Sequence, residues 1–262
     1  MILRYRESHL SSERNGRFLA RIAGLVSPFL VGTKRQIIVH RGVSLEADPT
    51  EIIDFSLIVG NTFESEVEAR IEQVSDSGMT CIDIGANVGY HTLPMARLVG
   101  SAGRVIAIEP SPWALKKLAR NLELNPELDS RVTVVERYLS DRTGMISATI
   151  QSSYPTNASK ANREYLQLQT TTLDELVDSL ALERIHFIKV DVDGGEVDVL
   201  LGSRLTLERW KPQILLEVSP HLWSHNAAAQ MRDLLGESEY KIRSLRGAPV
   251  IDLDQYLHDL CE

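Results

Sequence analysis

Acidic and glycine residues between Asp83 and Glu109 have the types and spacing of an adenosine-binding site. Asp83 lies near the end of a short apolar run, and Gly85 and Gly89 follow it in CIDIGANVGY, residues 81–90. Glycines at a strand-to-helix turn let backbone N–H groups approach a ligand that a Cβ would keep away. Glu109 ends the next apolar run about 20 residues later, where a carboxylate can accept hydrogen bonds from ribose hydroxyls. A tight turn without a ligand and a solvated strand-end charge are the simpler alternatives.

The loop favours S-adenosylmethionine over NAD as the adenosine-containing ligand. A dinucleotide loop reads G-x-G-x-x-G, with its second glycine where the backbone touches the diphosphate. Asn87 occupies that position here. Asp83 would repel a diphosphate and attract a cationic amino acid group. A sulfonium ligand with an ammonium end therefore fits better.

A second group of acids follows the apolar run FIKV, residues 187–190: Asp191, Asp193 and Glu196. Such a cluster could supply a general base with orienting groups, or hold a divalent cation through carboxylate oxygens. The alternative is negative charge that complements a helix N-terminus.

Two histidines and one buried acid are further candidates. His91 follows the glycine loop and His221 follows the run ILLEV, residues 214–218; either could act as a base, although a lone histidine is more often packed or on the surface. Glu217 lies inside that run, where a charge needs a partner or a function. Lys189 is the simple partner, and a contact with an acceptor or an ion is the other possibility.

An alternation of strands and helices positions these residues. Apolar runs and helical spacing predict strands at 79–84, 104–108, 132–135, 145–150, 185–190 and 214–218, and helices at 90–99, 111–122, 172–180, 195–201 and 227–235. Ser111 and Thr172 are the expected N-caps, and residues 240–245 with 249–253 could form a terminal hairpin. The order predicts an α/β fold, a doubly wound Rossmann-like parallel sheet with its ligand at the carboxyl ends of the strands.

The chain divides into an N-terminal extension, residues 1–75, and the S-adenosylmethionine-binding domain, residues 76–262. The extension contains an expected strand at 36–40 and a helix at 64–74, and could cover one side of the cleft. Residues 151–164 form the longest stretch without periodicity, which makes them a candidate lid or acceptor loop.

Composition excludes several classes of protein. The 262 residues carry a net charge of −8 with a pI near 5.5, so nucleic acid is not an expected partner. Cys81 and Cys261 lie too far apart for a zinc motif, and a reducing, cytoplasmic location is expected. The apolar stretch 18–31 is too short and interrupted for a membrane span. It is expected to pack on the domain, or else to lie on a surface or form a homo-oligomer contact.

Six blocks along the chain resemble the FkbM-type S-adenosylmethionine-dependent methyltransferases. The blocks are GNTFE (60–64), IDIGANVGYHT (82–92), IEPSP (108–112), TTLDEL (171–176), FIKVDVDGGE (187–196) and ILLEVSP (214–220). Six blocks in order are more specific than any single glycine motif. The chain departs from the family pattern at Asp193, where a Glu is usual, and the shorter carboxylate could alter acceptor or ion geometry.

The resemblance implies a class I methyltransferase fold and methyl transfer to a hydroxyl of a sugar or secondary metabolite, a small-molecule or saccharide acceptor. It implies cofactor contacts at Asp83, Gly85, Ala86, Asn87, Gly89, Glu109, Ser140 and Asp141, with Ser140 and Asp141 near the adenine. Asp141 also begins a good turn sequence, D-R-T-G. The expected catalytic residues are Asp191, Glu196 and His91, and a divalent cation is a possible second cofactor. An NAD-linked oxidoreductase and a non-catalytic nucleotide-binding module are the competing functions.

Overall fold

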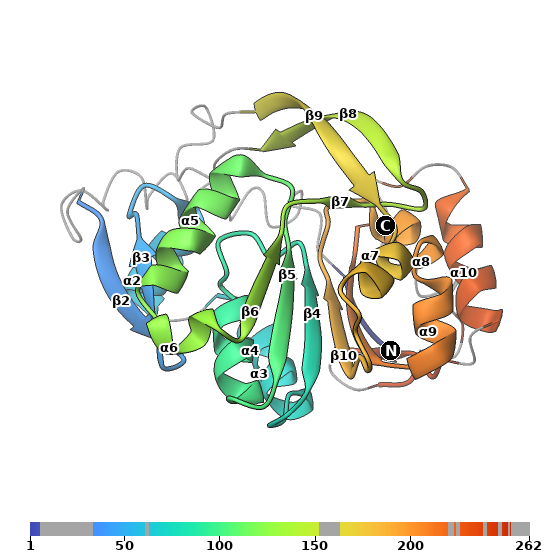
Figure 1. Cartoon of the computed structure of the whole chain (residues 1–262), viewed down its shortest axis with the longest axis horizontal. Helices are drawn as coiled ribbons and strands as arrows, with labels where there is room; N and C mark the ends of the chain where they lie inside the picture. Colours follow the sequence, from blue (N-terminus) through green and yellow to red (C-terminus); the bar gives the residue numbers. More distant parts are fainter. Residues whose placement is uncertain are drawn as a thin grey trace.

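A computed structural model describes residues 1–5, 34–60, 63–151, 163–219, 223, 226–237, 240–245, 248–250 and 252. Within these ranges the central element is a seven-stranded sheet in which all neighbouring strands are parallel (Figure 1). The strands in sheet order are β12 (Arg243–Ser244), β1 (Ile2–Tyr5), β11 (Gln213–Val218), β10 (Phe187–Val190), β4 (Thr80–Ile84), β5 (Arg104–Ile108) and β6 (Val132–Val135). The predicted α/β fold is confirmed.

Helices cover both faces of this sheet, as expected for a doubly wound fold. Strands β4, β5, β10 and β11 are apolar runs with almost every residue buried, as parallel strands buried on both faces require. One face packs against α3 (Ser65–Val74), α4 (Thr92–Val99) and α5 (Pro112–Glu123), with α6 (Pro126–Asp129) beside them. The other face packs against α7 (Leu173–Ser179), α8 (Glu196–Leu201), α9 (Arg204–Trp210) and α10 (Ala227–Glu237).

Side chains fix where two of these helices begin. The Ser111 hydroxyl accepts a hydrogen bond from the Ala114 N–H at 3.3 Å, and the Thr172 hydroxyl accepts one from the Glu175 N–H at 3.1 Å. Both residues therefore act as the predicted N-caps.

The order in which the chain adds strands to the sheet reverses between β4 and β10. From β4 the chain adds β5 and β6 on one side, and then returns to add β10 and β11 on the other. Ligands of doubly wound folds bind at such a reversal, outside the carboxyl ends of the strands. The glycine loop follows β4, and Asp191 follows β10.

A small sheet lies beyond the carboxyl edge of the central sheet (Figure 1). It consists of β7 (Tyr138–Leu139), β8 (Gly144–Gln151) and β9 (Arg163–Thr171), in the order β7-β9-β8. The predicted strand at 145–150 is confirmed as part of β8. Strand β9 escaped prediction because its sequence, REYLQLQTT, is mostly polar and exposed. Of the candidate acceptor loop, residues 152–162 lie outside the described part of the chain.

The N-terminal extension takes part in the fold through α3, through β1 and through a small hairpin with its helix. Strand β1 lies between β11 and β12 in the central sheet. Its four-residue run alone does not predict this position. The hairpin β2 (Gln36–His40) and β3 (Val43–Ala47), with α2 (Ile52–Gly60), packs beside α5. The predicted strand at 36–40 and helix at 64–74 are confirmed, and the predicted helix over 18–31 lies outside the described residues.

The expected terminal hairpin is reduced. Arg243 and Pro249 form an isolated antiparallel bridge, whereas β12 itself pairs in parallel with β1. Among the described residues no helix has the length and apolar character needed to cross a membrane.

Candidate active site at the carboxyl edge

The backbone N–H groups of the glycine loop are bonded inside the protein. The Gly85 and Ala86 N–H groups donate to the Ile108 carbonyl at 2.9 and 3.1 Å, and the Gly89 N–H donates to the Ala86 carbonyl at 2.9 Å. These three N–H groups are thus already bonded, and the contact of the loop residues with a donor stays a prediction. A diphosphate depends on such N–H groups, so the loop is unsuited to a dinucleotide.

Gly85 serves the approach of two strand ends. Its φ is +79°, and a Cβ built on it would lie 1.8 Å from the Asp191 carbonyl oxygen. The Asp191 N–H donates to the Ile84 carbonyl at 3.0 Å. Glycine at position 85 therefore lets the end of β10 lie against the end of β4, and this contact positions Asp191.

Glu109 closes the other side of the loop. Its buried carboxylate accepts hydrogen bonds from the Asn87 and Ser111 N–H groups, both at 2.8 Å. Burial raises the pKa of Glu109 above its ordinary value, against the opposing effect of these two donors. Asn87 adopts a left-handed φ of 49°, so the carboxylate stabilises a strained loop residue.

Asp83 is fully buried, and its charge is already balanced. One carboxylate oxygen accepts a 2.7 Å hydrogen bond from the Thr92 hydroxyl, and the other lies 3.4 Å from the Lys189 ammonium. Asp83 and Lys189 are register partners on adjacent strands, which places both side chains on one face of the sheet. The structure thus gives Asp83 a cation within the protein, and its contact with the donor's amino group stays a prediction.

Lys189 links Asp83 to the cleft. Its ammonium lies 3.2 Å from the Asp191 carboxylate. Burial would lower the pKa of Lys189, but Asp191 and Asp83 outweigh burial and raise it above the ordinary lysine value. The lysine is therefore a fixed positive charge behind Asp191. Glu217, its predicted partner, acts on it electrostatically and also raises its pKa.

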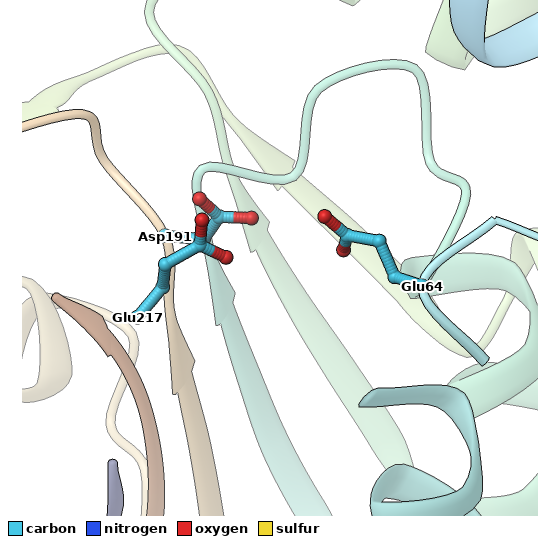
Figure 2. Close-up of side chains that lie close together, drawn as sticks. All are labelled: Glu64, Asp191 and Glu217. Carbon is cyan, nitrogen blue, oxygen red and sulfur yellow. The ribbon is translucent and has the colours of Figure 1, made fainter. Parts of the chain in front are cut away.

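Three carboxylates converge in front of this lysine. Glu64, Asp191 and Glu217 each bring one oxygen within 4.8 Å of the others, and Figure 2 shows Glu64 reaching from the start of α3 toward the ends of β10 and β11. This group could hold a cation that prefers oxygen ligands. We call it the acidic trio. Asp191 is the most accessible member, with 22% of its side chain exposed.

His91 contacts the trio through Glu64. Its Nε2 lies 3.3 Å from the Glu64 carboxylate, and its ring packs edge-on against Tyr90 at 4.9 Å. The predicted catalytic residues His91 and Asp191 are thus brought to the same cluster of side chains.

Glu196 is held apart from the trio. It is fully buried, and its two oxygens accept hydrogen bonds from the Gly194 N–H at 3.0 Å and the Trp223 indole at 2.7 Å. Burial raises its pKa. These contacts favour a role in fixing the turn before α8 over a role as base. Asp193 in the same turn is exposed, with a left-handed φ of 50°.

Ser140 and Asp141 lie after β7, beneath the small sheet. The Ser140 hydroxyl donates to the Asp141 carboxylate at 3.2 Å, and the Arg142 guanidinium lies 3.6 Å from that carboxylate. This geometry is compatible with both the turn and the adenine hypothesis, which stays a prediction. His221 lies outside the described residues.

Sequence reasoning missed Glu64, Thr92 and Trp223 as parts of this region. Trp223 is found only through the partner it binds in space, and Thr92 lies in the block IDIGANVGYHT without having been assigned a role. Glu64 did carry a signal, since it lies in the block GNTFE that supported the family resemblance.

Comparison with known proteins agrees with this geometry. The model of the methyltransferase FkbM domain matches residues 83–242. Methyltransferase sdnD of Sordaria araneosa is 30% identical over 173 residues, which cover 50% of this chain and 66% of that protein. The hexuronic acid methyltransferase AglP of Haloferax volcanii is 30% identical over 127 residues, covering 48% of this chain and 50% of that protein. The chain therefore spans between half and two thirds of the length of these relatives.

Among solved structures, the methyltransferase FkbM from Methylobacillus flagellatus KT is similar with a TM-score of 0.44 and 18% sequence identity, covering 64% of this chain and 44% of that one. The family model itself covers more than half of the sequence, including the glycine loop, Glu109 and Asp191. The chain belongs to the FkbM methyltransferase domain family.

Proposed function

We propose that this protein transfers a methyl group from S-adenosylmethionine to a hydroxyl group of a sugar or secondary metabolite. The observation that carries the proposal is the position of Asp191, whose carboxylate lies at the strand reversal beside the glycine loop, in contact with a buried lysine. An alcohol is a poor nucleophile unless a base removes its proton, and a carboxylate in the cleft can serve as that base.

The residues of the glycine loop fit a methyl donor. Glu109 would hold the ribose, because a carboxylate accepts hydrogen bonds from both hydroxyls, and the loop from Gly85 to Gly89 would line the amino acid end. S-adenosylmethionine, when bound, supplies an electrophilic methyl carbon on a positively charged sulfur. The acidic trio and Asp83 give this edge of the sheet more negative than positive charge, which suits such a cation.

The protein's own contribution to the step is position and proton removal. Asp191 accepts the proton of the acceptor hydroxyl while the oxygen lone pair forms the new bond to carbon. The electrons of the broken carbon–sulfur bond remain on sulfur. Lys189 keeps the Asp191 carboxylate in place through their 3.2 Å contact.

The saccharide class of acceptor is supported by a relative, since AglP is named for methylation of a hexuronic acid.

NAD-linked oxidoreduction is disfavoured, because the loop N–H groups and Glu109 leave no site for a diphosphate of the usual kind.

A screen with labelled donor tests the proposal. The full chain is incubated with S-adenosylmethionine carrying a labelled methyl group and a panel of hydroxylated saccharides and small metabolites. We expect label in at least one acceptor, at an oxygen. Label in none of the hydroxylated acceptors, or label only on amines, would contradict the proposed function. Turnover of any acceptor would exclude the alternative that the protein is a non-catalytic nucleotide-binding module.

A further inference from the structure

We propose that Glu64, supplied by the segment that precedes the matched methyltransferase domain, is a second catalytic carboxylate that touches the acceptor hydroxyl together with Asp191. The inference rests on the proposed function and adds a residue to it. Glu64 lies outside residues 83–242, which the family model matches.

The geometry brings Glu64 to the reacting edge of the sheet. Its carboxylate belongs to the acidic trio and lies on the side opposite Asp191 and Glu217 in Figure 2. Its side chain is 13% exposed and that of Asp191 is 22% exposed, whereas Glu217 is 4% exposed. An acceptor that enters this edge therefore meets Glu64 and Asp191 first, with Glu217 behind them.

The Glu64 side chain does not take the direction that is usual for an acid at the start of a helix. Glu64 is the N-cap residue of α3, where an acid ordinarily accepts a hydrogen bond from its own helix, yet it makes no such side-chain bond. Its φ and ψ of 56° and 46° are left-handed, a conformation that side chains other than glycine, asparagine and aspartate rarely adopt. The conformation turns the carboxylate away from α3 and toward Asp191.

His91 gives Glu64 a fixed orientation. The imidazole Nε2 lies 3.3 Å from one Glu64 oxygen. In the transfer step the hydroxyl proton passes to one of the two carboxylates, the hydroxyl oxygen bonds to the methyl carbon, and the carbon–sulfur electron pair stays on sulfur. Two carboxylates on one hydroxyl also fix the angle at which its lone pair faces the methyl group.

Variants at position 64 separate catalysis from structure. Glu64→Gln keeps the shape and removes the charge, whereas Glu64→Gly removes the side chain and suits the left-handed backbone. Glu66→Gln is the matched control, because Glu66 is an exposed acid in the first turn of the same helix. Each variant is tested with the acceptor that the labelled-donor screen identifies, for donor affinity, turnover at saturating donor and melting temperature.

We expect Glu64→Gln and Glu64→Gly to lose about 10²–10⁴-fold in turnover, as when a general base is removed. The donor affinity of both variants should stay within about twofold of the wild-type value. The melting temperature of Glu64→Gly should be no lower than that of the wild type. Sodium formate should restore part of the activity of Glu64→Gly alone. Turnover of Glu64→Gln within about threefold of the wild type, or equal losses in Glu66→Gln, would overturn the assignment of Glu64. Failure of the wild type to methylate any hydroxylated acceptor would instead overturn the proposed function, and the role of Glu64 with it.

Discussion

At the scale of single residues, the active edge depends on a buried chain of charges. Thr92 and Lys189 hold Asp83, and Lys189 in turn contacts Asp191. Breaking a buried ion pair by removing one partner typically costs about 3–5 kcal/mol. The lysine therefore stabilises the sheet and also places the most accessible carboxylate of the trio.

Asp191→Asn is expected to fold normally and to lose turnover. The amide keeps the shape of the side chain but cannot accept the acceptor's proton, so turnover at saturating donor should fall by about 10²–10⁴-fold. Donor affinity, measured by titration calorimetry on the same preparation, should change little. A variant that turns over at close to the wild-type rate would leave Asp191 with a structural role only.

The sequence predicted the residues at strand ends better than those that arrive from elsewhere. Asp83 lies near the end of an apolar run, and Glu109 and Asp191 directly follow such runs, whose parallel order brings their ends to one edge. Glu64 could not be placed in this way, because its contact with Asp191 depends on how α3 packs against the sheet. The ion pair of Asp83 escaped prediction for a similar reason, since its partner Lys189 is a neighbour in register and not in sequence.

At the scale of elements, the close contact between β4 and β10 is the feature that positions Asp191 beside the glycine loop. The buried strands of the central sheet were predictable because most of their positions are apolar. In contrast, β1 and β9 were missed: β1 is a short strand whose place depends on a distant partner, and β9 is largely exposed and polar. Tertiary pairing determines such strands more than local propensity does.

Gly85→Ala is expected to destabilise the protein before any effect on ligand binding. The new Cβ would lie 1.8 Å from the Asp191 carbonyl oxygen, and φ at this residue is +79°, so β4 and β10 must separate. We expect a loss of several kcal/mol, above the ~1–2 kcal/mol that left-handed backbone alone costs. Chemical denaturation measures the loss.

Gly236→Ala is the matched control. Gly236 lies in α10, and a Cβ there meets no atom within 4 Å. Alanine at an unstrained helical glycine should stabilise the protein by about 0.4–1 kcal/mol. Equal stability of Gly85→Ala and the wild type would show that the two strand ends do not meet at this glycine.

At the scale of the whole molecule, a buried polar cluster joins the N-terminal segment to the methyltransferase domain. Glu68 of α3 accepts hydrogen bonds from Tyr90, which follows the glycine loop, and lies 2.5 Å from His40 of β2. The Tyr90 hydroxyl also accepts a hydrogen bond from the Phe63 N–H at 3.0 Å, next to Glu64. The segment that supplies Glu64 is therefore anchored to the loop that is proposed to bind the donor.

This cluster predicts a pH dependence of stability. Burial would raise the pKa of Glu68, but hydrogen bonds from His40 and Tyr90 outweigh it and lower the pKa from 4.5 to about 2. A carboxyl whose pKa is lower in the folded state stabilises that state above its unfolded pKa, and this contribution disappears as the pH falls from 4.5 toward 2.

Glu68→Gln should therefore lower the free energy of unfolding at pH 7 by about 1–3 kcal/mol, and its difference from the wild type should narrow below pH 4.5. Glu72→Gln is the control, because Glu72 is a more exposed acid on the same helix that pairs only with the Arg41 guanidinium among the contacts described here. Denaturant unfolding of the wild type and the two variants at several pH values measures these differences in the free energy of unfolding. A difference that is constant from pH 7 to pH 3 would contradict the proposed charge state of Glu68.

Direct titration of the donor tests the central claim, that the edge between β4 and β10 binds S-adenosylmethionine with Glu109 at its ribose. Calorimetry with S-adenosylmethionine, and separately with NAD, is carried out on the wild type and on Glu109→Gln. We predict binding of S-adenosylmethionine but not of NAD by the wild type, and affinity lower by about 1–3 kcal/mol in Glu109→Gln, the loss expected for a hydrogen bond to a charged group. Binding of NAD without binding of S-adenosylmethionine, or equal affinity of the two proteins for S-adenosylmethionine, would contradict it.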